Sequence, residues 1–386
     1  MKEAFTQYEP APVRLALKHL DVRDAGVPLE ITVRPRGSDA DLLPERVELW
    51  VNDHLLETWP PRGKALDPKR PFAEPFTIAA DKFRTGENQV AVLTFNAAGG
   101  RTEDYQLVTN ARSPGDASLF AHLAGVNDYS AVRKNVVAAR NFGDVVRAHD
   151  DATALGKELV HYAGPKLLFK DAKIELQLDP AREKLTGNLA AIAKVAKPDD
   201  TLVVFFAGHG DLLMPHDAPL PDDGRSLLFS EGVFLFCCPD YSPDKPAATA
   251  LSAEELFAAL AKINCRKVVL LDACHSGRAT AANLVRRCVP NGQGPIIIAA
   301  CDQGELSYEH EKYGHGLFTF AVLDALDKTK GYRKADYNSD GALSADELFA
   351  HVAAKVPDLL KRAGLKEPQT PVSFPRELPK AALLKR

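Results

Sequence analysis

Short, mostly apolar segments in the second part of the chain constrain its fold more than any other feature. They occupy positions 122–126, 173–177, 201–206, 267–271 and 295–299. Between them lie stretches with apolar residues at helical spacing, at 136–155, 182–195, 253–263 and 317–326. Apolar strands joined by helices predict an α/β fold, with a mostly parallel sheet covered by helices on both faces. In such a sheet, functional groups gather in the loops at the carboxyl ends of the strands.

The first 112 residues follow a different pattern. Segments at 29–33, 47–51, 76–78 and 90–95 are apolar at every second position or in short runs, and turn-forming residues separate them. Several short strands at this spacing predict an immunoglobulin-like β-sandwich, although the segment lacks a cysteine pair. Breaker residues at 111–117 mark the boundary. We expect a sandwich at 1–112, acting as a spacer or binding an unknown protein partner, and a second domain at 118–386.

Charge and cysteine content exclude several classes of protein. The chain has 48 Lys and Arg against 52 Asp and Glu, a net charge of −4. It therefore lacks the excess of positive charge that binding to nucleic acid or to an anionic membrane requires. No apolar stretch approaches the roughly 20 residues of a membrane helix. The amino terminus lacks the apolar core of a signal peptide, and the six cysteines form no CxxC pair. We therefore expect a cytoplasmic protein that contains thiols, with neither nucleic acid nor a membrane as partner.

Two of the apolar strands end in residues that can carry chemistry. The strand at 201–206 leads to His209 and Gly210, and the strand at 267–271 leads to Asp272 and Cys274. A thiol becomes a nucleophile when a base lies beside it, and an imidazole can also protonate a leaving amine. Strand ends on the same sheet edge would bring the two side chains together. The backbone amides of Gly210 and Cys274 are then candidates for an oxyanion hole.

These two motifs resemble those of the caspase-like cysteine peptidases of clan CD, especially the prokaryotic caspase homologues and metacaspases. The resemblance extends over roughly 118–386 and includes the segments 300–305 and 314–319. It implies that Cys274 is the nucleophile and His209 the general acid and base of peptide-bond hydrolysis. It also implies protein or peptide substrates and a chemistry that requires no cofactor.

A carboxylate near the nucleophile suggests a preference for basic substrates. Asp272 stands two residues before Cys274, where the caspase signature has glutamine. A carboxylate in the first substrate pocket (S1) would pair with a basic side chain at the substrate's P1 position. The resemblance to metacaspases implies a second acidic residue on the helix after the first strand. Asp151 is the better candidate there and Asp150 the reserve, so we expect cleavage after Arg or Lys.

Two loops beside the proposed catalytic residues can gate the site. The segment 211–231 follows His209, and the segment 278–294 follows Cys274 and contains several arginines. In the related family, the region after the nucleophile-bearing strand is often cut during maturation, so the resemblance suggests self-processing at 278–294. His275 follows the nucleophile directly, and we expect it to order the loop. The other five cysteines are expected to be packed thiols.

A further motif near the carboxyl terminus matches a calcium-binding loop. Residues 336–347 fit the EF-hand pattern D-x-[DN]-x-[DN]-G-x5-E at every fixed position. The expected calcium ligands are Asp336, Asn338, Asp340, the carbonyl of Ala342 and Glu347. A helix at 345–356 should follow, whereas 331–335 is expected to be a loop. A bound ion would hold that helix in place; the alternative is an ion-free turn with a helix cap.

Other enzyme classes lack support in the sequence. The chain contains no GxSxG, GxxxxGK[ST] or HExxH motif. We therefore favour a cysteine endopeptidase. The alternatives are a catalytically silent caspase-like interaction module and a calcium-dependent binding protein. The peptidase is preferred because both catalytic residues are present.

Overall fold

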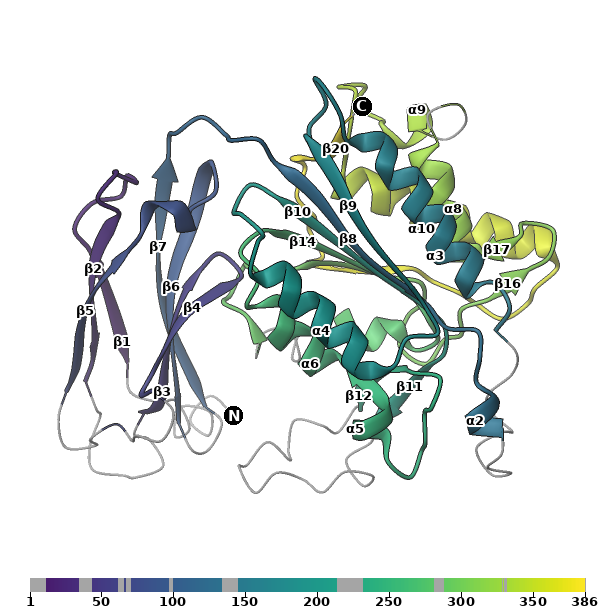
Figure 1. Cartoon of the computed structure of the whole chain (residues 1–386), viewed down its shortest axis with the longest axis horizontal. Helices are drawn as coiled ribbons and strands as arrows, with labels where there is room; N and C mark the ends of the chain where they lie inside the picture. Colours follow the sequence, from purple (N-terminus) through teal and green to yellow (C-terminus); the bar gives the residue numbers. More distant parts are fainter. Residues whose placement is uncertain are drawn as a thin grey trace.

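The computed structural model describes residues 12–34, 44–61, 66, 71–96, 100–133, 145–213, 232–280, 288–327, 329 and 332–385. Within these residues the chain forms two parts that pack against each other (Figure 1). The amino-terminal part consists of strands in antiparallel sheets, and the second part is an α/β structure.

The central sheet of the second part has six strands in the described residues. In spatial order they are β19 (Val372–Phe374), β15 (Ile296–Ala299), β14 (Arg266–Asp272), β10 (Thr201–Ala207), β8 (Ser118–Gly125) and β9 (Asp171–Leu178). All neighbouring pairs are parallel except β15 and β19. The predicted mostly parallel sheet is therefore confirmed, with one antiparallel strand at its edge.

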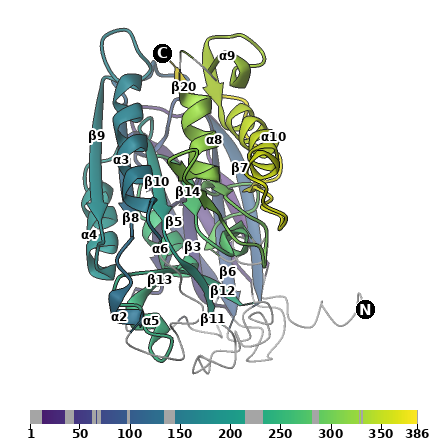
Figure 2. The ribbon, with the colours of Figure 1, turned by 90° about the vertical axis from the view of Figure 1, so that its right-hand side faces the viewer.

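Helices cover both faces of this sheet, as predicted. One face carries α3 (Ala148–Leu159), α8 (Leu317–Leu326) and α10 (Ala345–Ala363), and the other carries α4 (Arg182–Ala193) and α6 (Ala253–Leu260). Figure 2 shows α3, α8 and α10 side by side. Along β10, Val203 and Phe205 pack in the apolar cluster under α3, α8 and α10. Val204 and Phe206 pack in the cluster under α4 and α6. Because successive side chains of a strand point to opposite faces, a wholly apolar strand satisfies both layers.

Two antiparallel sheets precede this structure. The first contains β1 (Val13–Leu17), β2 (Val27–Val33) and β5 (Phe72–Ile78), and the second contains β4 (His54–Trp59), β3 (Pro44–Val51), β6 (Gly86–Asn96) and β7 (Arg101–Asn110). Both sheets contribute to one apolar core, which includes Ile31 and Leu49. The immunoglobulin-like topology and the domain limits at 112 and 118 stay predictions.

The sandwich packs against the amino-terminal ends of the central strands. Trp50 and Leu93 belong to the same apolar cluster as α6 and β14. The ammonium of Lys267, at the start of β14, is fully buried and lies 2.9 Å from Asp53 Oδ1. Lys267 Nζ also donates to the backbone oxygen of Asp53 at 3.1 Å. The sandwich is thus attached directly to the strand that leads to Cys274.

The remaining described elements are short. They are α2 (Ser130–Arg133), β11 (Gly210–Leu213), β12 (Val233–Cys237), α5 (Pro246–Thr249), β13 (Ala250–Ser252), β16 (Glu309–His310), β17 (His315–Gly316), α9 (Tyr332–Ala335), β18 (Ala342–Ser344) and β20 (Ala382–Lys385). Single turns of 3-10 helix occur at Ala80–Lys82, Val160–Tyr162 and Ser276–Thr280. No helix in the described ranges is long and apolar enough to cross a membrane.

Most predicted helices are confirmed, with changed boundaries. The helix expected at 136–155 corresponds to α3, which begins at Ala148. Residues 134–144 lie outside the described part of the chain. The helix expected at 345–356 continues to Ala363, and its Pro357 lies inside it. The prediction of a loop at 331–335 was wrong, since α9 forms one helical turn there.

Candidate active site

The two motif-bearing strands end at the same edge of the sheet. β10 and β14 pair in parallel with Ala207 opposite Asp272, so both chains leave the sheet at the same level. His209 and Cys274 follow directly and line one cavity of about 280 Å³, together with Asp151 and Asp272. The structure therefore brings together four of the residues selected from the sequence.

The backbone of Gly210 lies against that of Cys274. A Cβ atom at Gly210 would lie 2.2 Å from the Cys274 carbonyl oxygen, so only glycine permits this approach. The two residues proposed to form the oxyanion hole are thus direct neighbours in space.

Tyr129 supports His209 from the loop after β8. Its hydroxyl accepts a hydrogen bond from the His209 backbone nitrogen at 2.8 Å and donates one to the Cys237 carbonyl at 3.2 Å. Its ring centroid lies 4.6 Å from that of the His209 imidazole. The side chain is fully buried. Sequence reasoning missed Tyr129, because nothing in its spacing connects it to a histidine 80 positions later.

The Cys274 thiol is half-buried, and its Sγ lies 4.0 Å from the Ser307 carbonyl oxygen. Burial raises the pKa of this thiol, and the nearby Asp272 carboxylate acts in the same direction. The resting group is therefore a neutral thiol, which needs a base to become a nucleophile.

All six cysteines, each within the described part of the chain, are thiols. Burial raises the pKa of Cys238, Cys265 and Cys301 to about 12, which makes them unreactive. The expectation of packed thiols away from Cys274 agrees with the burial of four of them, whereas Cys288 is half-buried.

Asp272 is buried and accepts three hydrogen bonds. Its Oδ1 accepts from Ser307 Oγ at 2.6 Å, and its Oδ2 accepts from the nitrogen and hydroxyl of Thr319 at 3.1 and 2.5 Å. Burial raises the pKa of this carboxyl, while the hydrogen bonds from Ser307 and Thr319 oppose that rise. Donors of this kind favour a charged carboxylate.

Asp151 approaches the same place from the first turn of α3. Its Oδ1 lies 2.6 Å from His315 Nδ1, and its Oδ2 accepts from Gly316 N at 3.1 Å. A Cβ atom at Gly316 would lie 2.6 Å from Asp272 Oδ2 and 3.2 Å from Asp151 Oδ2, so the glycine separates two neighbouring carboxylates. Burial raises the pKa of Asp151 to about 7, and the Asp272 charge contributes to the rise.

Asp150, the reserve candidate, does not line the cavity. It is exposed, and its carboxylate lies 3.5 Å from Arg147 on the solvent side of α3. Of the two neighbouring carboxylates, only Asp151 faces the thiol cavity.

The segment from Ser307 to Gly316 forms a wall of the cavity, and sequence reasoning had placed only residues 314–316 of it in a family-like stretch. Ser307, Tyr308, Glu309 and Gly316 all line the cavity. Glu309 accepts hydrogen bonds from the nitrogens of Val146 and Arg147 at 3.1 and 2.9 Å. Its pKa is raised, mainly by burial. Glu309 is thus a third carboxylate of the site, and no sequence motif predicted it.

His275 adopts a backbone φ of +59°, an uncommon conformation for a residue with a side chain. Its nitrogen donates to the Glu305 carbonyl at 3.0 Å, which holds the turn after Cys274. The role of ordering this loop stays a prediction. Residues 214–231 of the first predicted gating loop and residues 281–287 of the second lie outside the described residues.

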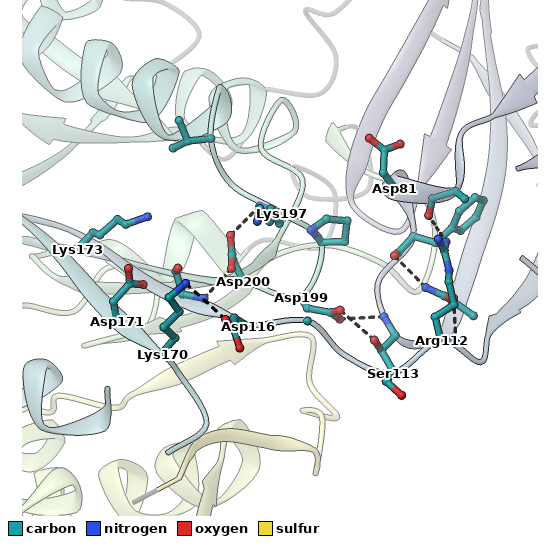
Figure 3. A pocket seen from close by; sticks show the side chains of 18 residues that line it. Asp81, Arg112, Ser113, Asp116, Lys170, Asp171, Lys173, Lys197, Asp199 and Asp200 are labelled. Carbon is teal, nitrogen blue, oxygen red and sulfur yellow. Dashed lines mark hydrogen bonds and ion pairs between the residues drawn. The ribbon is translucent and has the colours of Figure 1, made fainter. Parts of the chain in front are cut away.

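A larger cavity of about 510 Å³ lies between the sandwich and the central sheet (Figure 3). It adjoins the amino-terminal ends of β8 and β9, at the edge opposite Cys274, and none of the described residues that line it is a cysteine or a histidine. Asp199 accepts hydrogen bonds from Thr85, and Asp200 accepts them from the nitrogens of Ser118 and Lys197. These carboxylates join segments of the chain, so the smaller cavity is the candidate active site.

The calcium-like loop has the backbone of a compact turn. Asp336 accepts hydrogen bonds from the nitrogens of Asp340 and Gly341 at 3.2 and 3.0 Å. Ser344 and Glu347 form a capping box at the start of α10. In the described ranges, no group of three or more His, Cys, Asp or Glu side chains converges as metal ligands. The expected ligand atoms of the loop are carboxylate, amide and carbonyl oxygens, which Ca²⁺ prefers, so their chemistry fits this ion.

One strand accompanies this loop. β18, which contains Ala342 of the loop, pairs in antiparallel fashion with β20 near the carboxyl terminus. The only EF-hand-like loop of the sequence is therefore supported by a strand instead of a second loop.

Comparison with known families identifies the second part of the chain. The sequence profile described as "Caspase domain" matches residues 125–382. A search of curated proteins found no match.

Three solved structures are similar in part. A protein of Geobacter sulfurreducens is 17% identical over 70% of this chain and 97% of its own, with a TM-score of 0.45. Caspase-1 of Spodoptera frugiperda is 14% identical over 67% of this chain and 86% of its own, with a TM-score of 0.41. The Drosophila initiator caspase Dronc is 9% identical over 66% and 78%, with a TM-score of 0.38. The assignment rests on the sequence profile, which covers more than half of the chain.

Proposed function

Because the chain belongs to the caspase-domain family of cysteine peptidases, we propose that it is an endopeptidase with Cys274 as nucleophile and His209 as general acid and base. The observation that supports this most is that both side chains line one cavity at the carboxyl ends of β10 and β14. Strand ends are where the functional groups of parallel sheets gather.

The proposed reaction proceeds in two steps. His209 takes the proton of the Cys274 thiol, and the sulfur attacks the scissile carbonyl carbon. The amides of Gly210 and Cys274 donate to the oxyanion, and His209 then gives its proton to the leaving amine as the peptide bond breaks. In the second step His209 deprotonates a water molecule, which hydrolyses the thioester and returns the thiol. A base is needed because burial keeps the resting thiol neutral.

We assign Asp272 and Asp151 to the S1 pocket, and we expect Arg or Lys at P1. Both carboxylates line the thiol cavity beside Glu309, and among the described residues His209 is the only basic one that also lines it. His315 pairs with Asp151 from β17. A pocket with three carboxylates would bind a guanidinium or an ammonium and reject an acidic side chain.

The assignment can be tested by active-site labelling. A peptide chloromethyl ketone with Arg at P1 should alkylate the wild-type chain at Cys274 and leave Cys274→Ala and His209→Ala unlabelled. Labelling that survives Cys274→Ala would contradict the assignment. A folded wild-type chain that resists the reagent would favour the silent interaction module.

We further propose that residues 278–294 are cut by the enzyme itself. Intact-mass measurements should then show fragments of the wild-type chain and none of Cys274→Ala. The thiol chemistry also favours a reducing, cytoplasmic setting. An unknown protein partner of the sandwich remains part of the proposal.

We also propose that Asp336, Asn338, Asp340, the Ala342 carbonyl and Glu347 hold a Ca²⁺ ion. Their oxygens provide hard ligands, and the ion would tie the start of α10 to the loop and to β20 through β18. This is a stabilising role, and the peptidase chemistry does not require the ion.

A further inference from the structure

A buried glutamine from the carboxyl-terminal segment reaches the wall of the thiol cavity. Gln369 lies between α10 and β19, and its side chain is 1% exposed. Its Nε2 donates to the Ala300 carbonyl at 3.2 Å and to Ser307 Oγ at 3.1 Å. Its Oε1 accepts from the Tyr308 nitrogen at 3.1 Å. One buried amide therefore holds three positions around the site.

The two backbone partners determine which end of this amide faces Ser307. The Tyr308 N–H group can donate only to the amide oxygen of Gln369, and the Ala300 carbonyl can accept only from its amide nitrogen. Nε2 therefore approaches Ser307 as a donor, and the Ser307 hydroxyl must direct its own proton elsewhere. Its partner is Asp272 Oδ1 at 2.6 Å. The hydrogen bonds thus run in one direction, from Gln369 through Ser307 to Asp272.

The loop that Gln369 holds also contacts the nucleophile. The Ser307 carbonyl lies 4.0 Å from Cys274 Sγ, and the Glu305 carbonyl accepts from the His275 nitrogen at 3.0 Å. On its outer side, the Glu305 carboxylate accepts from the Thr370 nitrogen at 2.6 Å. Residues 369–370 therefore fix a loop whose inner side touches both the thiol and the carboxylate of the cavity.

We propose that Gln369 is a positioning residue for substrate specificity, which directs the Ser307 hydroxyl toward Asp272 and so keeps that carboxylate ready to bind a cationic P1 side chain. The inference rests on the proposed function, because it concerns the same cavity. The charged and titratable groups around Asp272 are Asp151 from α3, Glu309 from β16, His315 from β17 and Cys274. Most of these groups are acidic, so donors are needed to keep Asp272 charged among them.

The isosteric variant Gln369→Glu tests the direction of this chain of hydrogen bonds. It replaces the donor that faces Ser307 by an acceptor, so the hydroxyl turns toward it and Asp272 loses a donor. With an Arg-P1 fluorogenic peptide at about pH 7, we expect KM to rise about tenfold and kcat to change less than about twofold. The difference in KM should shrink as the pH rises, because a higher pH favours the charged form of Asp272 even without this donor.

A second variant and a second reagent separate positioning from folding. Ser307→Ala should raise KM as Gln369→Glu does, and the double variant should be no worse than either single one. Iodoacetamide reacts with Cys274 without using the S1 pocket, so its rate should stay within about twofold in all variants. Gln89→Glu is the matched control, since Gln89 is a buried glutamine at the sandwich junction that donates to the Asn291 carbonyl at 3.1 Å. Its KM should equal that of the wild type.

Two outcomes would overturn the inference while the proposed function stands. One is an active Gln369→Glu or Ser307→Ala enzyme with unchanged KM, and the other is an equal loss of peptide hydrolysis and of iodoacetamide reactivity. A wild-type chain that reacts with iodoacetamide but does not hydrolyse the Arg-P1 peptide would instead remove the proposed specificity, and this inference with it.

Discussion

The Tyr129 hydroxyl accepts a hydrogen bond from the His209 backbone nitrogen at 2.8 Å, while its ring lies 4.6 Å from the imidazole. Gly208, between β10 and His209, has a φ of +150°, and a Cβ atom there would lie 2.6 Å from the same hydroxyl. The tyrosine therefore fixes both the backbone and the ring of the proposed general base.

Tyr129→Phe should lower kcat about tenfold or more with little change in KM, because the ring remains but the backbone of His209 loses its acceptor. The free energy of unfolding should fall by about 1–3 kcal/mol, since buried polar groups lose a partner. Tyr162→Phe is the matched control: Tyr162 is equally buried and donates to the Leu326 carbonyl at 3.0 Å, away from the cavity. It should lose stability and keep its kcat. Equal effects of both variants on kcat would refute a role for Tyr129 in positioning.

Hydrolysis of Arg-P1 peptides should depend on the charge of Asp151. Burial raises the pKa of this carboxyl to about 7, so it is neutral at lower pH and charged at higher pH. KM should therefore fall as the pH rises through about 7, when the pocket gains a negative charge. In Asp151→Asn, KM should be high and should lack this step. Asp150→Asn changes the exposed neighbour and should behave like the wild type; the same loss in both variants would place the charge elsewhere.

The buried pair of Lys267 and Asp53 should couple the sandwich to the peptidase domain. Lys267→Met leaves a carboxylate without its cation and should reduce the free energy of unfolding by about 3–5 kcal/mol. Adding Asp53→Asn should recover much of the loss, because the uncompensated charge disappears. Urea unfolding of the single and double variants measures this coupling. Additive losses would show that the pair acts independently.

Calorimetry should detect the proposed calcium site. The wild-type chain should release or take up heat with Ca²⁺ at up to about millimolar concentration, and Asp336→Ala should not, because it loses the first ligand of the loop. Asp346→Asn is the control, since this residue belongs to the loop but is not an expected ligand, and it accepts a hydrogen bond from the Tyr337 hydroxyl. No heat from the wild-type chain would remove the site.

The sequence was sufficient for the features that depend on local pattern. The apolar strand at 201–206 had to lie between two helical layers, and it does, because its side chains enter both clusters. The positions of His209 and Cys274 at neighbouring strand ends followed from the same reasoning. The register of β10 and β14 then places them at one level.

Other features depend on the folded chain and left no local signal. Gln369 meets Ser307 only because α10 ends and β19 returns beside β15. Lys267 reads as an ordinary charged residue at the start of a strand, and its partner Asp53 lies in a distant turn. Contacts between residues so far apart in the chain are fixed by tertiary packing, which neither periodicity nor spacing records.

A panel of fluorogenic peptides that differ only at P1 tests the central claim most directly. The 386-residue chain should hydrolyse the Arg and Lys members with a kcat/KM at least about a hundredfold above that for Asp, and Cys274→Ala should hydrolyse none of them. Efficient cleavage after Asp would contradict the acidic pocket formed by Asp272 and Asp151, and cleavage by Cys274→Ala would contradict the nucleophile.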